Sequence, residues 1–230
     1  MLTAVRDYCR GTASLRILSV GAGIGLFEVP MIKMLLADGI EIPAFVGIDN
    51  DLHACVVLRK SLLDEFGDNP NSIVQHTAFQ DFNPDSIFDL ILFNHVFEYL
   101  QGSHLKWIQK SKRLISDNGN IIIFSPNRGG INKIYESVEN LAPFFANDLE
   151  SILADNAIPY ATKLLVANCD ITILGESDDD GDKIRLLSFL TQIDCRQIST
   201  NKRKEYLEYF QSLCPAGKHS IPHPTTLITL

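Results

Sequence analysis

A run of alternating glycines follows the first apolar segment of the chain. Residues 16–20 read Arg-Ile-Leu-Ser-Val, and glycine then occupies positions 21, 23 and 25. Glycine has no Cβ, so it can adopt positive φ and let backbone N–H groups approach a ligand at the start of the next helix. A strand, a glycine turn and a helix in this order predict the first unit of a nucleotide-type α/β fold. Tight turns also need glycine for structural reasons alone, which is the alternative explanation.

The spacing of these glycines separates two classes of cofactor. A dinucleotide site usually reads G-x-G-x-x-G, whereas this turn reads G-x-G-x-G. The difference favours S-adenosylmethionine (AdoMet) over NAD. Asp49 ends the next apolar segment, where many nucleotide sites place the acid that accepts the ribose hydroxyls. The alternative role is an N-cap for the helix that begins near Asn50 and Asp51.

Length and composition fit one soluble globular domain. The chain has 230 residues, of which 46% are hydrophobic and 21% are charged. No apolar run approaches the roughly 20 residues of a spanning helix, and no secretory leader is visible, so we expect a cytoplasmic protein without a membrane partner. The formal charge of −8 argues against nucleic acid as a substrate. The five cysteines are scattered and odd in number, so we expect reduced thiols and no metal site.

The predicted elements alternate in the βαβ manner. This order predicts an α/β fold: a Rossmann-like, doubly wound, seven-stranded, mainly parallel sheet with helices on both faces. The predicted strands are 16–20, 43–48, 72–76, 88–94, 119–124, 159–166 and 225–230. The predicted helices are 26–38, 51–66, 103–116, 129–140 and 146–156. The turn-forming run Asp117-Asn118-Gly119 is expected to break the chain before the fifth strand.

A long excursion precedes the last predicted strand. We expect a single domain over 1–230, with a helical insertion at 168–222 that contains helices at 182–193 and near 201–213. Insertions beside a ligand crevice commonly shape substrate access. A surface elaboration that serves stability or dimerisation is the alternative.

Polar residues follow the fourth predicted strand. Ligands of open α/β sheets lie at the carboxyl ends of the strands, so Asn94, His95, Glu98 and Tyr99 are predicted near the reactive end of the cofactor. An imidazole titrates near neutral pH, so His95 could accept a proton or a hydrogen bond from a substrate. Alternatively, His95 closes the strand by bonding a backbone carbonyl, and Glu98 braces the turn.

Three further features carry a resemblance to a known family. Ser19 stands two residues before the first glycine, the segment 125–135 reads Ser-Pro-Asn-Arg-Gly-Gly-Ile-Asn-Lys-Ile-Tyr, and the segment 147–153 is followed by Cys169-Asp-Ile-Thr. With these features, the chain from about Leu15 to Leu230 resembles the class I AdoMet-dependent methyltransferases. Within them it is most similar to the histamine N-methyltransferase-like group. The tryptophans of that group after the fifth strand are Ile131 and Tyr135 here, which argues against histamine as the acceptor.

The resemblance implies a set of site residues. AdoMet, with S-adenosylhomocysteine (SAH) as product, would be held at its methionine part by Gly21 and its neighbours and at its ribose by Asp49. Gln80 and Asp81 would border the adenine, and Asn94 would lie by the methionyl end. The predicted cofactor-binding residues are Ser19, Gly21, Ala22, Gly23, Gly25, Asp49, Asn50, Gln80, Asp81, Asn94 and His95. The predicted substrate-binding residues are His95, Glu98, Tyr99, Asn127 and Tyr135, of which His95 and Tyr99 are the catalytic candidates.

A sulfonium methyl is already electrophilic, so catalysis consists mainly of placing a nucleophile in line and removing its proton. We expect transfer to a small-molecule acceptor, with N-methylation of an amine as the leading reaction. The alternatives are O-methylation of a carboxylate or hydroxyl of a natural product, N-methylation of a peptide, and a non-catalytic cofactor-binding partner subunit. A monomer or a homodimer is expected.

Overall fold

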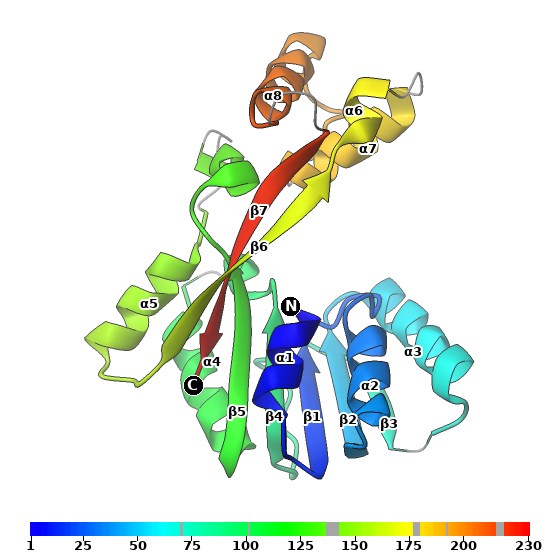
Figure 1. Cartoon of the computed structure of the whole chain (residues 1–230), viewed down its shortest axis with the longest axis vertical. Coiled ribbons are helices and arrows are strands. Elements are labelled where there is room, and N and C mark those ends of the chain that lie inside the picture. Colours follow the sequence, from blue (N-terminus) through cyan, green and yellow to red (C-terminus); the bar gives the residue numbers. More distant parts are fainter. Residues whose placement is uncertain (70, 101, 137–142, 177–179, 192, 215–218) are drawn as a thin grey trace. The chain divides into compact units, whose positions relative to one another are not determined.

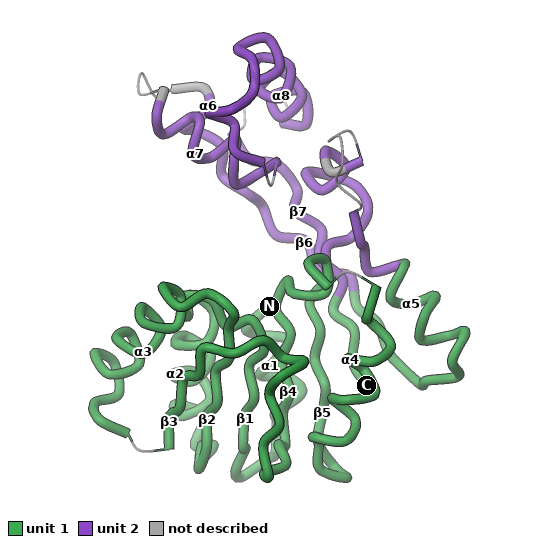
Figure 2. The backbone as a smooth tube through the Cα atoms, turned by 180° about the vertical axis from the view of Figure 1, so that it is seen from behind, with its two compact units in different colours: residues 1–125, 148–163, 227–230 green, residues 126–147, 164–226 purple. Residues whose placement is uncertain are grey.

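The chain divides into two compact units. The computed structural model describes residues 1–69, 71–100, 102–136, 143–176, 180–191, 193–214 and 219–230. Unit 1 comprises residues 1–125, 148–163 and 227–230, and unit 2 comprises residues 126–147 and 164–226 (Figure 2). The insertion predicted at 168–222 therefore falls within unit 2.

The strands of the described residues form one seven-stranded sheet with the order β3-β2-β1-β4-β5-β7-β6 (Figure 1). The strands are β1 (Ser14–Val20), β2 (Glu41–Asp49), β3 (Ser72–His76), β4 (Phe88–Asn94), β5 (Ile115–Pro126), β6 (Ala161–Asp170) and β7 (Ser220–Thr229). The helices that begin in unit 1 are α1 (Leu2–Tyr8), α2 (Glu28–Ala37), α3 (Leu52–Phe66) and α4 (His104–Leu114), with a 3-10 turn η1 (Phe97–Tyr99). Helix α5 (Ala146–Asp155) begins in unit 2 and continues in unit 1.

Strand direction follows the predicted pattern. β1 pairs in parallel with β2 and β4, and the outer pairs β2–β3 and β4–β5 are parallel as well. At the far side of β5, Ile121 and Leu230 each donate a backbone N–H to the other's carbonyl, which is the exchange of an antiparallel pair. The expected Rossmann-like, seven-stranded, mainly parallel sheet is confirmed.

The crossovers define where a ligand can lie. From β1 the chain moves outward through α2 to β2, and from β4 it moves in the opposite direction through α4 to β5. Right-handed crossovers that run in opposite directions place these helices on opposite faces of the sheet. The two directions diverge between β1 and β4, so the crevice at the carboxyl ends of these two strands is the topological switch point.

The central strands are apolar because both faces of the sheet are covered. Ile17 and Leu18 of β1, Ile91 of β4 and Ile122 of β5 are each fully buried. The amino-terminal ends of β1 and β4 are tied by Arg16, which donates from Nη2 to Asp89 Oδ1 at 2.8 Å and from Nε to Oδ2 at 2.9 Å. Hydrogen bonding to Arg16 holds the pKa of Asp89 well below its ordinary value.

Three predicted strand boundaries were wrong: β6 ends at Asp170 rather than 166, β7 begins at Ser220 rather than 225, and β5 begins at Ile115 rather than 119. The run Asp117-Asn118-Gly119 does not break the chain before the fifth strand, because β5 begins directly after α4 and contains it. The register instead shifts there: Phe88 faces Ile115, whereas Leu90 faces Asn120. The extra residues of β5 form a bulge-like irregularity in its pairing with β4. Turn-forming residues are favoured at such irregularities as well as in turns.

A second difference concerns residues 129–140, which were predicted as a helix. The described part is the 3-10 helix η2 (Gly130–Glu136), and residues 137–140 lie outside the described residues. Gly130 explains the tighter start: its φ is +52°, and a Cβ there would lie 2.6 Å from the Pro222 carbonyl oxygen. Helices α1 and α6 were not predicted.

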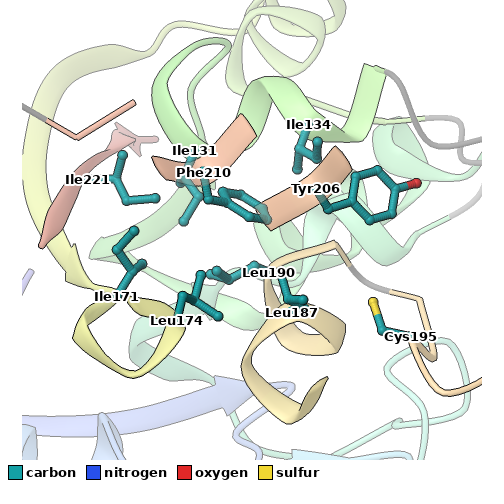
Figure 3. Close-up of a cluster of buried hydrophobic side chains, with 10 residues drawn as sticks. All are labelled: Ile131, Ile134, Ile171, Leu174, Leu187, Leu190, Cys195, Tyr206, Phe210 and Ile221. Atoms are coloured by element: carbon teal, nitrogen blue, oxygen red, sulfur yellow. The ribbon is translucent and has the colours of Figure 1, made fainter. Parts of the chain in front are cut away.

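Unit 2 has its own hydrophobic core. It contains η2, α6 (Thr172–Glu176), α7 (Asp180–Thr191) and α8 (Thr200–Ser212). Figure 3 shows the buried side chains that these helices contribute, with Leu187 and Leu190 from α7 and Tyr206 and Phe210 from α8. The two helices predicted in this region are confirmed within two residues at their ends.

Candidate functional site

A pocket of about 1000 Å³ lies in unit 1, at the carboxyl ends of the sheet strands. Val20 and Gly21 line it after β1, Ile48 and Asp49 at the end of β2, and His95 after β4. The pocket therefore coincides with the topological switch point. Its other lining residues are Asn50, Thr77, Ala78, Phe79, Gln80, Val96, Tyr99, Leu100, Ser103, Lys106, Trp107, Lys110 and Arg113.

The three glycines of the turn all have positive φ, but for different reasons. A Cβ on Gly21 would lie 2.5 Å from Val96 Cγ2, and one on Gly25 would lie 2.5 Å from Leu58 Cδ1. These two glycines are required by the packing of the protein itself. Gly23 has a φ of +55°, and apart from its chain neighbours no described residue comes within 4 Å of the place where its Cβ would stand. Of these three, Gly23 alone leaves open space where a side chain would otherwise stand, whereas Gly21 is the one that lines the pocket.

Asp49 ends β2 beside this turn. Its Oδ2 accepts a hydrogen bond from the Gly23 N–H at 2.8 Å, and its Oδ1 accepts one from the Asp51 N–H at 2.9 Å. Each carboxylate oxygen has a second acceptor position, so the group can bind hydroxyl donors while it is held in place. The N-cap of α3 is Asp51, which accepts from the His53 N–H at 2.8 Å. The N-cap role weighed for this segment therefore belongs to Asp51, and the Asp49 carboxylate remains the candidate acceptor.

Ser19 lies on β1 with its side chain fully buried, and it is not among the residues that line the pocket. Its hydroxyl donates to Glu28 Oε1 at 2.9 Å. Burial raises the pKa of Glu28 to about 7, although the Ser19 hydrogen bond acts in the opposite direction. Sequence reasoning missed Glu28. The available signal was an acid inside an otherwise apolar run, Leu26-Phe-Glu-Val, directly after the glycines.

The turn after β4 brings His95 and Glu98 together. His95 Nδ1 lies 3.0 Å from Glu98 Oε1, and both side chains are largely buried. His95 has a φ of +56°, a conformation that L side chains rarely adopt and that often occurs at functional sites. Its backbone N–H donates to the Phe124 carbonyl, so His95 also closes the strand. Tyr99 lines the same pocket and is 62% exposed.

Two buried acceptor atoms near this turn lack hydrogen-bond partners among the described residues. They are Asn94 Oδ1 at the end of β4 and Glu98 Oε2. Buried polar atoms are normally paired, so an orphaned acceptor is a position where a ligand or water can supply the missing donor. Asn94 is not itself among the residues that line the pocket.

The segment after β3 forms another wall of the pocket. Gln80 lines it, while Asp81 is exposed and is not among the lining residues. Lys110 Nζ donates to the carbonyl oxygens of Phe79 at 2.7 Å and Gln80 at 3.0 Å, which fixes this wall against α4. The Phe79 ring contacts the Trp107 ring with centroids 4.8 Å apart.

Lys106, Lys110 and Arg113 form a cationic stripe on α4 that sequence reasoning did not single out. Their spacing of four and three residues places them on one face of the helix, and all three line the pocket. No acidic residue occurs in α4. The stripe could have been recognised from this spacing once α4 was assigned.

The remaining predicted substrate residues belong to unit 2. Asn127 donates its side-chain amide to Thr226 Oγ1 at 2.9 Å, and Asn132 donates to the Asn127 carbonyl at 2.9 Å. Tyr135 lies in η2, and its side chain is outside the described part of the chain. Of the other cofactor candidates, Ala22 is buried and donates its N–H to the Ile48 carbonyl, and Gly25 packs on Leu58 as described above.

The described residues show neither a metal-binding cluster nor a membrane-spanning helix. Within the ranges given above, no cluster of three or more His, Cys, Asp or Glu residues has a metal-binding arrangement. Of the helices in the described part of the chain, none combines the length and apolar character needed to cross a membrane.

Comparison with known proteins identifies the family. The methyltransferase domain family matches residues 5–162, and the chain therefore belongs to this family. No curated protein matches the chain at a significant level. The fold and family together confirm the predicted class, that of the class I AdoMet-dependent methyltransferases.

Several solved structures share the fold at low sequence identity. The YcgJ protein of Bacillus subtilis has a TM-score of 0.65 and 13% identity, with 99% of this chain and 96% of that chain covered. An AdoMet-dependent methyltransferase of Thiobacillus denitrificans in complex with SAH has a TM-score of 0.59 and 13% identity, with 100% and 90% covered. The plantazolicin methyltransferase BpumL, in complex with a triazolic desmethylPZN analog and SAH, has a TM-score of 0.53 and 18% identity, with 99% and 82% covered.

Proposed function

We propose that this protein binds AdoMet in the pocket of unit 1 and transfers its methyl group to a small-molecule acceptor. One observation carries the proposal: the Asp49 carboxylate is fixed by the Gly23 N–H at the one position of the glycine turn that faces open space. This is a rigid acceptor for a diol beside a backbone surface that a ligand can approach closely. Two proteins of the same fold are complexed with SAH, which supports this choice of cofactor.

The proposed roles of the cofactor residues follow from their positions. Asp49 binds the ribose hydroxyls, and Asn50 and Gln80 border the adenine from two walls of the pocket. Gly21 and Gly23 present their backbone to the methionine part, and the orphaned Asn94 Oδ1 accepts a hydrogen bond at that end. Ser19 supports the turn through Glu28 and does not bind the cofactor directly in this proposal.

N-methylation of an amine is our leading reaction. AdoMet, when bound, supplies an electrophilic methyl group, so the protein must deliver a neutral amine and remove its proton. The His95 imidazole is oriented by Glu98 through Nδ1, which prepares it to accept a hydrogen bond or proton from an acceptor. Tyr99 at the same wall completes the acceptor side in this proposal.

A second candidate reaction is O-methylation of a carboxylate. The cationic stripe of Lys106, Lys110 and Arg113 favours it, because three cations along one wall would attract an anionic acceptor. In that reaction the acceptor arrives already ionised and needs no base, so His95 would serve only to position it.

We place the chain near the histamine N-methyltransferase-like group, with an acceptor other than histamine. We propose a single cytoplasmic methyltransferase domain, monomeric or homodimeric, in which the insertion 168–222 and residues Asn127 and Tyr135 serve acceptor recognition.

The cofactor proposal is tested by calorimetry of the full chain with AdoMet and with SAH. Asp49→Ala should weaken the binding of both by roughly 1–3 kcal/mol through the loss of charge-assisted hydrogen bonds. Asp64→Ala, which removes an exposed carboxylate of α3, is the matched control and should bind as the wild type does. Absence of AdoMet and SAH binding by the folded wild type would refute the proposed function.

The acceptor is tested by a screen with methyl-labelled AdoMet against matched sets of amines and carboxylic acids. Label in the amine set supports the leading reaction, and label in the acid set supports the second. AdoMet binding without transfer to either set, or to peptide amines, would favour a non-catalytic cofactor-binding subunit.

A further inference from the structure

Glu28 is a buried acid that the proposed chemistry does not use. It is the first residue of α2 and is 2% exposed. The Ser19 hydroxyl donates to its Oε1 at 2.9 Å, so the pair joins the end of β1 to the start of α2. The nine-residue separation of the two side chains contains the whole glycine turn. The carboxyl thus closes the loop whose backbone is proposed to hold the methionine part of AdoMet.

Glu28 lies within electrostatic reach of one residue that lines the pocket. Among the described residues, the charged side chain that acts on Glu28 is Asp49, whose negative charge raises the pKa of Glu28 in addition to the larger effect of burial. Asp49 itself touches the turn at the Gly23 N–H. A positive charge brought to the same turn must lower the pKa of Glu28, because its sign is opposite to that of Asp49. The buried surroundings screen this interaction only weakly.

Methyl transfer changes the charge of the ligand at this turn. AdoMet carries a positive sulfonium, and SAH carries a neutral thioether in its place. We propose that the Glu28 carboxyl discriminates between them: when ionised it favours AdoMet over SAH, and when protonated it does not. This inference rests on the proposed function, and it makes Glu28 a positioning and selectivity residue that never touches the reacting atoms.

The sign of the effect follows from the protonation state. Because the pKa of Glu28 lies at about 7 in the ligand-free protein, the group is mostly protonated at pH 6 and mostly ionised at pH 8. The preference for AdoMet over SAH should therefore grow as the pH rises through this interval. Product release is favoured by the same change of charge, because transfer removes the cation that the ionised carboxyl attracts.

The experiment is calorimetric titration of the full chain with AdoMet and separately with SAH, from pH 6 to pH 8.5. Both ligands carry α-amino groups that titrate in this range, so the quantity to compare is the change in the affinity ratio between wild type and Glu28→Gln. Glutamine keeps the shape and a hydrogen-bonding partner for Ser19 but carries no charge. We expect the AdoMet preference of the wild type to rise by about threefold to tenfold more than that of Glu28→Gln. Glu65→Gln, a change of the same kind at a partly exposed acid of α3, should behave as the wild type does.

A second variant keeps the test independent of the folding of Glu28→Gln. Ser19→Ala retains the carboxyl and removes the hydrogen bond that stabilises its ionised form, so the rise in preference should move to higher pH. Binding of both ligands with identical pH dependence in wild type, Glu28→Gln and Ser19→Ala would overturn the inference and leave the proposed function intact. Absence of binding to either ligand in the wild type would overturn both.

Discussion

The glycine at position 23 differs from its two neighbours in what it faces. Gly21 and Gly25 would bring a Cβ to 2.5 Å from Val96 and Leu58, whereas Gly23 faces open space. All three were predicted to bind the cofactor, with a purely structural turn as the alternative. The distinction depends on side chains that are 33 and 75 residues away along the chain, so a local sequence pattern could not reveal it.

Gly23→Ala is therefore the most selective change in the turn. Its positive φ should cost the folded state about 1 kcal/mol, and the new methyl group should also reduce SAH affinity by at least about tenfold by occupying the open position. Thermal unfolding and calorimetry measure the two effects. Gly39→Ala is the matched control, because Gly39 has a φ of +80° and open space around it but follows α2, whereas the Gly23 N–H donates to the pocket residue Asp49. A loss of SAH affinity in Gly39→Ala equal to that in Gly23→Ala would refute this interpretation.

At the scale of elements, the turn between β4 and α4 carries the residues most directly involved in the proposed chemistry. It places His95 at a positive φ and pairs its Nδ1 with Glu98 three residues later. The i, i+3 spacing of a histidine and an acid is visible in the sequence. The 3-10 geometry that makes the spacing a contact is not, because it depends on the buried Phe97 packing on Phe93.

His95→Asn tests the role of this turn. Asparagine tolerates the left-handed conformation better than most residues, so the backbone should be preserved while the titratable ring is lost. We expect turnover with an amine acceptor to fall by about 10²-fold or more, with SAH affinity nearly unchanged. Steady-state kinetics on the acceptor found by the screen, together with calorimetry, separate the two quantities. An unchanged turnover would assign His95 to strand closure alone.

The strands and helices near the glycine turn were predicted well because their signals are local. β3 and β4 were placed without error, and α3 begins one residue from its expected start. The start of β5 was missed because Asp117-Asn118-Gly119 has turn chemistry, and only the register with β4 shows that it is absorbed within the ladder. Likewise, η2 begins at Gly130, whose close approach to Pro222, 92 residues away along the chain, no local pattern reveals.

At the scale of the whole molecule, each of the two units has its own core, so we expect the two units to differ in stability. Phe210 of α8 is fully buried in the core of unit 2. Phe210→Ala should cost about 3–5 kcal/mol through the cavity that it leaves, and it should loosen unit 2 first. Hydrogen exchange should show lost protection in α7 and α8, with β1 and β4 still protected.

Phe189→Ala is the control for this prediction, because Phe189 is 69% exposed on α7 of the same unit. Its protection pattern should match that of the wild type. A uniform loss of protection across both units in Phe210→Ala would show that the two cores unfold as one cooperative system.

The residues that complete the pairing of β5 are the last of the sheet to be synthesised. Residues 227–230 belong to unit 1, and Leu230 exchanges two hydrogen bonds with Ile121 of β5. These residues leave the ribosome after every residue of unit 2. The parallel core of β1 to β4 can therefore form early on the nascent chain, but one edge of β5 stays open until translation has delivered all of unit 2. A chaperone that protects exposed strand edges would have its binding site on β5 during that interval.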